Sequence, residues 1–256
     1  SYDSTTTADS SILTIASGVS GESLSLTGAG ILGAASAGTQ TITNNNTLAI
    51  ADGTGSASNY TLNGASINVT VIPKTLNVTL AREYDGTTTV AGALLTPTFD
   101  SLQGGETLAI SGTGSVANAN VGSSKAVTLG TIALAAGSGN PGNYSLNSVL
   151  LDVTQRVINL DGIRAYDATT NVLSSDINTF GNIVSGETLT ISGTGSVATN
   201  SVEMNKAISL GTLSLGNGSG AAGNYTLAGG THTFDISPVA VNITGSRQYD
   251  GTNVID

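Results

Sequence analysis

The sequence predicts an all-β protein made of tandem β-sandwich or β-grasp-like modules of about 82 residues, arranged as an elongated rod. Charged residues make up only 9% of the chain, against about 25% in an ordinary globular protein, so hydroxyl and amide side chains must form much of the surface. Thr, Val, Ile and Leu are frequent, and helix-favouring residues are scarce, which favours strands joined by Gly and Asn turns. Short sequences also return at a regular spacing, as in repeat proteins.

Three short markers recur in the same order. Tyr-Asp begins at Tyr2, Tyr84, Tyr166 and Tyr249, which lie 82, 82 and 83 residues apart. Gly-Glu follows, and Asn-Tyr comes 38 residues after Gly-Glu in each of three copies. The markers predict an N-terminally truncated first repeat over 1–73, a second over 74–155, a third over 156–238 and the start of a fourth over 239–256. We therefore expect the chain to be an excerpt of a longer protein.

Alternating apolar and polar residues predict the strands of each repeat. Residues 76–80, Leu-Asn-Val-Thr-Leu, have the period of two that marks a half-buried strand. Residues 158–160 and 241–243 are the equivalent strands of the next two repeats, and 107–110 and 127–129 follow similar patterns. Asp-Gly, Gly-Gly and Asn-Pro-Gly sequences between them predict turns. The order of the strands does not follow from these patterns.

Composition excludes several functional classes. A net charge of −10 repels nucleic acid, and the absence of Cys excludes disulfides and Cys-based metal or redox sites. No apolar run approaches the roughly 18 residues of a membrane helix, so no membrane insertion is expected. The chain has no Asp-x-Asp-x-Asp-Gly loop and no Gly-Gly-x-Gly-x-Asp nonapeptide. No cofactor is therefore expected, and calcium held by singly spaced carboxylates is the alternative.

An enzyme is not expected. His232 is the only His, and the other copies have none at its position, so we expect a solvent-facing strand residue. No Ser-His-Asp set can repeat along the chain, and no nucleophilic Cys exists. Paired carboxylates acting as acid and base, as in glycosidases, are the remaining catalytic alternative.

The recurring charged and aromatic residues allow two interpretations. An Arg lies two residues before each of the last three Tyr-Asp motifs, on the same strand face. Arg, Asp and Glu could form a ligand or ion site. Alternatively they lock a module joint, where Asp binds its own turn, Tyr packs and Arg pairs with a nearby carboxylate; we expect this joint. The candidate residues are Tyr2, Asp3, Tyr84, Asp85, Tyr166, Asp167, Tyr249, Asp250, Arg82, Arg164, Arg247, Glu22, Glu106, Glu187, Asn59, Tyr60, Asn143, Tyr144, Asn224 and Tyr225.

Together the markers resemble the YDG repeat of large bacterial surface proteins. They read Tyr-Asp-Gly-Thr-Thr at 84–88, Gly-Glu-Thr at 105–107 and Gly-Asn-Tyr-Ser-Leu at 142–146. Such repeats occur in filamentous-haemagglutinin-like, two-partner-secreted adhesins. The resemblance covers the whole chain, but Ser4 and Ala168 replace the Gly after Asp. We therefore do not expect this position to require a left-handed backbone.

The resemblance implies an extracellular location at the bacterial surface, associated with the outer membrane. It implies a structural stalk segment of a secreted adhesin, supporting cell adhesion or a biofilm matrix. The expected partners are neighbouring modules of the same chain and, through other regions, extracellular polysaccharide or a host cell surface. Two alternatives stay open. The repeats themselves bind glycan, matrix or a like chain, or the chain is a continuous β-helix, although no sub-repeat of about 20 residues is present.

Overall fold

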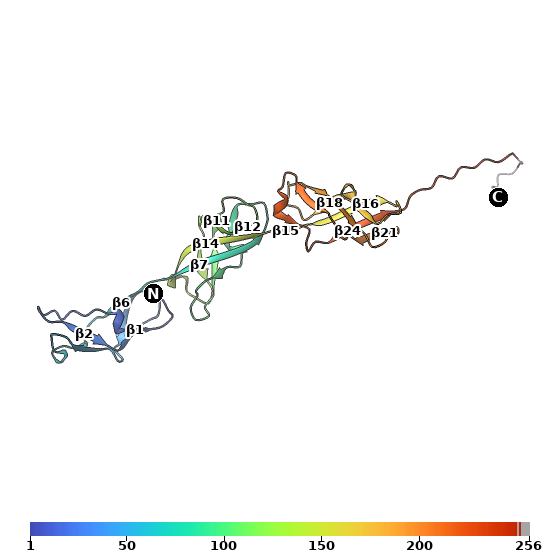
Figure 1. The fold of residues 1–256 in the computed structure, drawn as a ribbon. Helices are drawn as coiled ribbons and strands as arrows, with labels where there is room; N and C mark the ends of the chain where they lie inside the picture. Colours follow the sequence, from blue (N-terminus) through green and yellow to red (C-terminus); the bar gives the residue numbers. More distant parts are fainter. Residues whose placement is uncertain (250, 252–256) are drawn as a thin grey trace. The chain divides into compact units, whose positions relative to one another are not determined.

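The computed structural model describes residues 1–249 and 251, and over this range it contains strands and short 3₁₀ turns but no α-helix (Figure 1). The chain forms two compact units, Ser1–Thr154 and Gln155–Asp256. The predicted all-β class with tandem modules is confirmed. No helix in the described part is long and apolar enough to span a membrane. The 3₁₀ turns are η1 (Ser10–Ile12), η2 (Ala57–Asn59), η3 (Gly92–Leu94), η4 (Pro141–Asn143), η5 (Ser174–Asp176) and η6 (Ala222–Asn224).

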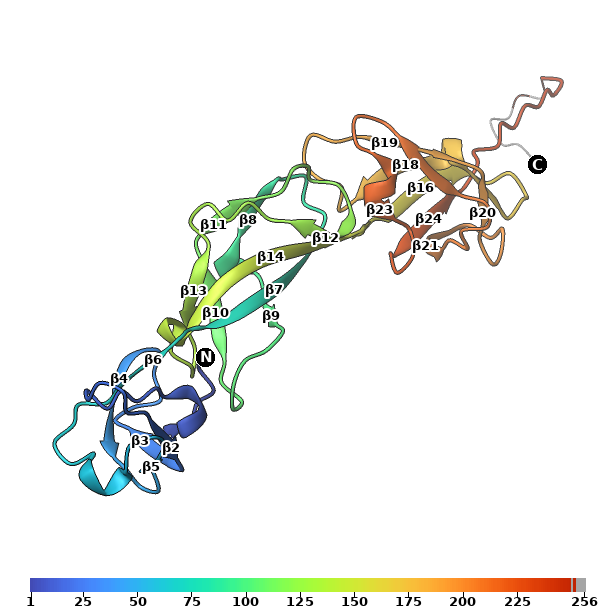
Figure 2. The same cartoon turned by 60° about the vertical axis from the view of Figure 1, so that its left-hand side comes forward.

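The second repeat shows the complete module (Figure 2). Its first and last strands pair in parallel at the centre of a mixed sheet of order β12-β14-β7-β9. The outer strands of this sheet are antiparallel, as are the small pairs β10–β13 and β8–β11. The strands are β7 (Lys74–Glu83), β8 (Thr89–Ala91), β9 (Thr98–Phe99), β10 (Leu108–Ser111), β11 (Thr113–Ser115), β12 (Gly122–Ala126), β13 (Ala133–Ala136) and β14 (Tyr144–Thr154).

The core of this module follows from the alternation along β7. Leu76, Val78 and Leu80 are 0%, 1% and 0% exposed, whereas Asn77 between them faces solvent. Val149 and Leu151 of β14 lie opposite Val78 and Leu80 and are buried as well. The period of two therefore predicts the buried face of β7 correctly.

The second unit repeats the same arrangement. Its strands β16 and β24 pair in parallel at the centre of the sheet β18-β16-β24-β21. Gly162 stands opposite Phe234 where the second repeat has Leu80 opposite Leu151, so one large ring replaces two Leu side chains. The strands are β15 (Arg156–Val157), β16 (Asn159–Ala165), β17 (Asn171–Leu173), β18 (Ile177–Gly181), β19 (Leu189–Ser192), β20 (Thr194–Ser196), β21 (Glu203–Ala207), β22 (Ser214–Asn217), β23 (Tyr225–Thr226) and β24 (His232–Ser237).

The first repeat has the sheet order β1-β3-β4-β6, so β6 is an edge strand paired only with β4. The backbone N–H of Tyr2 donates to the carbonyl of Ile72 just beyond β6 over 2.8 Å. Tyr84 donates to Thr154 in the same way at the end of the β7–β14 ladder. The strands are β1 (Thr7–Asp9), β2 (Leu24–Thr27), β3 (Ala29–Leu32), β4 (Gly38–Asn44), β5 (Ala49–Asp52) and β6 (Asn68–Val71).

Three local predictions are wrong. Residues 241–243 form no strand, and the whole segment 238–249 is exposed without secondary structure. Residues 127–129 form only an isolated bridge, between Thr128 and Ser115. His232 is buried, because it lies on the central strand β24: its Nδ1 accepts from the Leu160 N–H over 3.1 Å, and its Nε2 donates to the Leu227 carbonyl over 2.8 Å.

Candidate functional site

The Tyr-Asp motif ends the first strand of a module and makes a tight turn. In the second repeat, Asp85 Oδ1 accepts from both the N–H and the hydroxyl of Thr87, over 2.9 and 3.0 Å. The side chain of Arg82 is 9% exposed and lies 3.0 Å from Asp85 Oδ2. Its guanidinium also donates to the carbonyls of Thr87 and Thr89. The Asp and Arg are therefore engaged by the turn that they stabilise.

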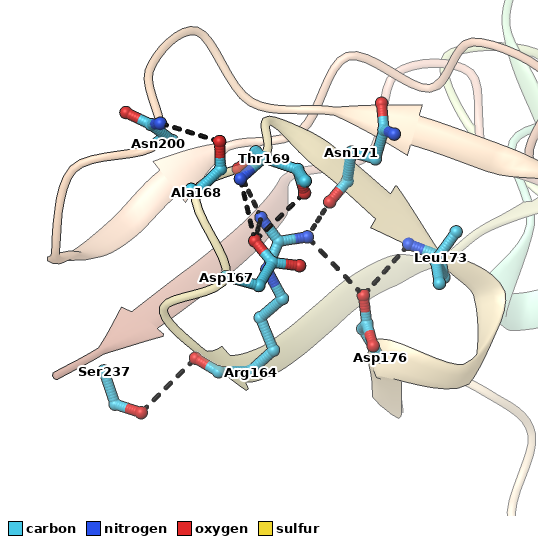
Figure 3. A network of polar contacts seen from close by, with 9 residues as sticks. All are labelled: Arg164, Asp167, Ala168, Thr169, Asn171, Leu173, Asp176, Asn200 and Ser237. Atoms are coloured by element: carbon cyan, nitrogen blue, oxygen red, sulfur yellow. Dashed lines mark hydrogen bonds and ion pairs between the residues drawn. The ribbon is translucent and has the colours of Figure 1, made fainter. Parts of the chain in front are cut away.

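The third repeat builds the same turn, drawn in Figure 3. Asp167 Oδ1 accepts from the Thr169 N–H over 2.9 Å and lies 3.0 Å from the Arg164 guanidinium. The pKa of Asp167 is lowered mainly by the hydrogen bond from the Thr169 backbone and, to a smaller extent, by the positive charge of Arg164. Arg164 also donates to the carbonyls of Thr169 and Asn171 and packs over the ring of Phe234 at 5.4 Å.

The residue after Asp adopts a left-handed backbone in every described copy. The prediction that this position does not require such a backbone, which was based on the Ser and Ala found there, is therefore wrong. The φ angle is 65° at Ser4, 77° at Gly86 and 65° at Ala168, and Gly251 has 79°. Ser and Ala accept the strain of this conformation because the Asp side chain closes the turn around them. In the first repeat, too, Asp3 Oδ1 accepts from the Thr5 N–H over 2.9 Å, and this bond lowers the pKa of Asp3.

A second cluster joins the first repeat to the second inside unit one. Tyr2 donates to Glu106 Oε1 over 2.6 Å, and Tyr144 donates to Glu106 Oε2 over 2.5 Å. The two rings meet edge to face, with their centroids 5.3 Å apart and their planes at 78°. Both tyrosines are buried, with Leu76 and Leu108 in the same cluster. We call Tyr2, Glu106 and Tyr144 the tyrosine clamp.

The clamp shifts the acidity of its phenols. Burial, followed by the hydrogen bond to Glu106, raises the pKa of Tyr144 to about 12. The hydrogen bond to Glu106, followed by burial, raises the pKa of Tyr2 as well. Both hydroxyls are therefore neutral donors at neutral pH, and the carboxylate of Glu106 accepts from each of them.

Two further residues of this joint were missed by the sequence analysis. A Cβ atom on Gly139 would lie 2.8 Å from Glu106 Oε2, so the carboxylate needs a Gly beside it. The signal was present: Gly55, Gly139 and Gly220 each stand 33 residues after the Glu of the Gly-Glu marker. The second missed residue is Ala37 of the first repeat. Its backbone N–H donates to Asn143 Oδ1 of the second repeat over 2.9 Å.

The Tyr–Glu contact recurs within the other repeats. Tyr225 donates to Glu187 Oε2 over 2.7 Å, and the Val184 N–H donates to the Tyr225 hydroxyl over 3.2 Å. In the first repeat Tyr60 donates to Glu22, and this bond is the first cause that raises the pKa of Tyr60. The Gly-Glu and Asn-Tyr markers thus meet in space in each repeat.

The structure separates the candidate residues into two groups. Arg and Asp form the turn, whereas each Glu accepts from the Tyr of its Asn-Tyr marker, and Tyr2 joins this contact at Glu106. Asn143 and Asn224 are buried, and Asn59 is exposed. Tyr166 and Tyr249 are 42% and 91% exposed, Arg247 is exposed, and Asp250 lies outside the described residues. Within residues 1–249 and 251, no three His, Asp or Glu side chains gather closely enough to hold a metal ion.

A family model described as the YDG domain matches two stretches of the chain, residues 72–150 and 154–233. Together they span more than half of the 256 residues. Each match begins near the first strand of a complete module and includes its Tyr-Asp, Gly-Glu and Asn-Tyr markers. No curated protein and no solved structure matches the chain.

Proposed function

Because the chain belongs to the YDG domain family, we propose that it is a structural stalk segment of a large secreted bacterial adhesin, supporting cell adhesion or a biofilm matrix. The observation that carries this proposal is the tyrosine clamp. Tyr2 belongs to the first repeat, and Glu106 and Tyr144 belong to the second, so the hydrogen bonds tie one module to its neighbour.

The recurring polar residues support a mechanical role. Asp85 and Asp167 close their own turns, and Arg82 and Arg164 donate to carbonyls of those turns. Charge-assisted bonds of this kind are among the stronger ones available to a protein. The motif residues therefore contribute to the rigidity of a module and of its joint. A stalk segment that carries a mechanical load requires such rigidity.

The surroundings of such a stalk are part of the proposal. We place the protein outside the cell, at the bacterial surface, with neighbouring modules as its partners and polysaccharide or host surfaces contacted by other regions. The absence of Cys and the thinly spread net charge of −10 suit a soluble surface fibre that needs no oxidative folding. No enzymatic activity and no cofactor form part of the proposal.

Small-angle scattering of the whole chain tests the stalk. A compact globule of this length has a radius of gyration of about 18 Å, whereas three modules in line give about 30 Å and a maximum dimension near 100 Å. The proposal requires the larger values, at several concentrations extrapolated to zero. A radius near 18 Å would overturn it, because a folded-back chain cannot hold an adhesive tip away from the cell.

A further inference from the structure

The second and third repeats differ in charge at the end of the 3₁₀ turn that follows β8 and β17. Leu94, the last residue of η3, corresponds to Asp176, the last residue of η5, at the spacing of 82 residues. Leu94 is 84% exposed, whereas the side chain of Asp176 is 17% exposed. The acidic side chain therefore lies within the third repeat, and its partners there show what the second repeat leaves open.

In the third repeat the carboxylate of Asp176 lies between two positive partners (Figure 3). Its Oδ2 accepts from the Leu173 N–H over 3.0 Å and lies 3.9 Å from Nη1 of Arg164. The same guanidinium lies 3.0 Å from Asp167 Oδ1. One Arg thus faces two carboxylates at once, which its planar group with five N–H donors allows.

The second repeat keeps the cationic partner of this arrangement. Arg82 corresponds to Arg164, its side chain is likewise 9% exposed, and its Nη1 lies 3.0 Å from Asp85 Oδ2. Among residues 1–249 and 251, no second carboxylate lies within ion-pair distance of the Arg82 guanidinium. Arg82 therefore lacks the counterpart of Asp176.

The second repeat also keeps the backbone donor. Ala91 of β8 stands opposite Thr113 of β11, and the adjacent pair is hydrogen-bonded, since the Gly92 N–H donates to the Gly112 carbonyl over 2.9 Å. Bonded and non-bonded pairs alternate along an antiparallel ladder. The Ala91 N–H therefore points away from β11, as the equivalent N–H of Leu173 does in the third repeat.

A hollow of about 290 Å³ lies beside these two donors. Arg82, Ala91 and Leu94 line it, and they are the equivalents of the three residues that form the contact in the third repeat. Leu95 adds a second apolar side chain, and Asp85 is the other charged residue of the lining. The hollow therefore combines a cation and a backbone donor with an aliphatic wall.

We propose that this hollow binds an aliphatic carboxylate in the position that the Asp176 side chain takes in the third repeat. One oxygen of the ligand accepts from the Ala91 N–H and faces Arg82, and charge-assisted contacts of this kind are among the stronger ones. The hydrocarbon part lies against Leu94 and Leu95 and removes apolar surface from water. Free short-chain acids and the acidic side chains of another protein share this chemistry. The site lies within one repeat, so the inference is independent of the stalk proposal.

Nuclear magnetic resonance of the isotope-labelled whole chain tests the site. When sodium butanoate replaces sodium chloride at constant ionic strength, we expect saturable shifts of the Ala91 N–H and Arg82 Nε–H signals. Butanamide has the same shape without the charge and is expected to leave both signals unchanged. No saturable shift at Ala91, or equal shifts with butanamide, would overturn the proposal.

A second probe distinguishes the two sources of the carboxylate. The blocked peptide Ser-Ser-Asp-Ile copies residues 174–177, which carry the carboxylate in the third repeat. Tighter binding of this peptide than of butanoate assigns the site to an acidic side chain of a protein partner. Tighter binding of butanoate assigns it to a free acid. Either order supports a carboxylate site.

The substitution Leu94→Asp gives the second repeat the arrangement of the third. The carboxylate then comes from the chain itself, so the Ala91 N–H signal moves without ligand and no longer responds to butanoate. Ala93→Asp is the matched control, because it adds the same charge at the neighbouring exposed position and keeps the response. Both positions are exposed, so neither variant alters the core. An undiminished response in Leu94→Asp, or an equal loss in both variants, contradicts the assignment.

Discussion

The hydroxyl group of Tyr2 donates to Glu106 Oε1 over 2.6 Å, which links residues 104 positions apart in the chain. The same carboxylate accepts from Tyr144 through its other oxygen, so one side chain holds a Tyr of the first repeat and the Tyr that begins the last strand of the second. A half-buried carboxylate with both oxygens occupied is costly to disrupt from either side, because each loss leaves a polar group without its partner.

Replacing the shared carboxylate is expected to weaken unit one. Glu106→Ala leaves the hydroxyls of Tyr2 and Tyr144 without their acceptor and lowers the free energy of unfolding by about 2–4 kcal/mol. Denaturant unfolding followed by tyrosine fluorescence measures this loss. Glu22→Ala is the control, since Glu22 is exposed and holds Tyr60 only, and its effect is smaller. Equal effects of the two substitutions would show that the joint adds nothing to the stability of the module.

Alkaline pH is expected to destabilise the same unit. The folded-state pKa of Tyr144 is raised to about 12, above the ordinary value of about 10. A raised pKa contributes stability that is fully present below pH 10 and is lost as the pH rises from about 10 to about 12, because the unfolded chain ionises first. The denaturation midpoint therefore falls across this window.

The variant Tyr144→Phe checks the origin of that alkaline loss. Phe cannot ionise, so the slope of stability against pH becomes shallower between pH 10 and 12, although the variant starts from a lower stability. Tyr249→Phe keeps the wild-type slope, since Tyr249 is 91% exposed. A wild-type slope in Tyr144→Phe would contradict the assignment.

The turn that carries the motif is expected to depend on its Asp. Asp85→Ala removes the acceptor of the Thr87 N–H and the ion pair with Arg82, whose side chain is 9% exposed. Because Asp85 itself is half exposed, we expect a loss of about 1–2 kcal/mol, measured as a lower melting temperature. Asp85→Asn keeps an oxygen for the Thr87 N–H and loses less. An unchanged melting temperature in Asp85→Ala would assign the motif to another role.

The left-handed position after Asp offers a stabilising substitution. Ala168 has a φ of 65°, a conformation that costs a non-Gly residue about 1–2 kcal/mol. Ala168→Gly relieves this strain and is expected to stabilise the second unit by about 0.5–1 kcal/mol after the entropy of Gly is deducted. Gly86→Ala is the reverse change at the equivalent turn and is expected to destabilise the first unit. Calorimetry measures both, and a lower melting temperature for Ala168→Gly would refute the strain.

The sequence by itself determined the class of the fold, the repeat and the buried face of its first strand. These properties are local: the alternation of Leu76, Val78 and Leu80 depends on neighbours two residues away, and the Asp of each Tyr-Asp motif binds its own turn two residues on. The left-handed backbone after Asp could not be predicted from the residue at that position. Ser and Ala rarely adopt this conformation, but here the turn imposes it on them.

Only the tertiary structure decided which strands pair and what the markers meet. The parallel pairing of β7 with β14 joins residues about 70 positions apart, and Glu106 finds Tyr2 across 104. The same need for a distant partner explains why residues 241–243, with the same alternation as β7, form no strand. It also explains why His232 is buried on a central strand, where the Leu160 N–H and the Leu227 carbonyl satisfy its ring. An alternating pattern of apolar and polar side chains favours a strand. The strand forms only when another segment supplies the partners for its backbone hydrogen bonds.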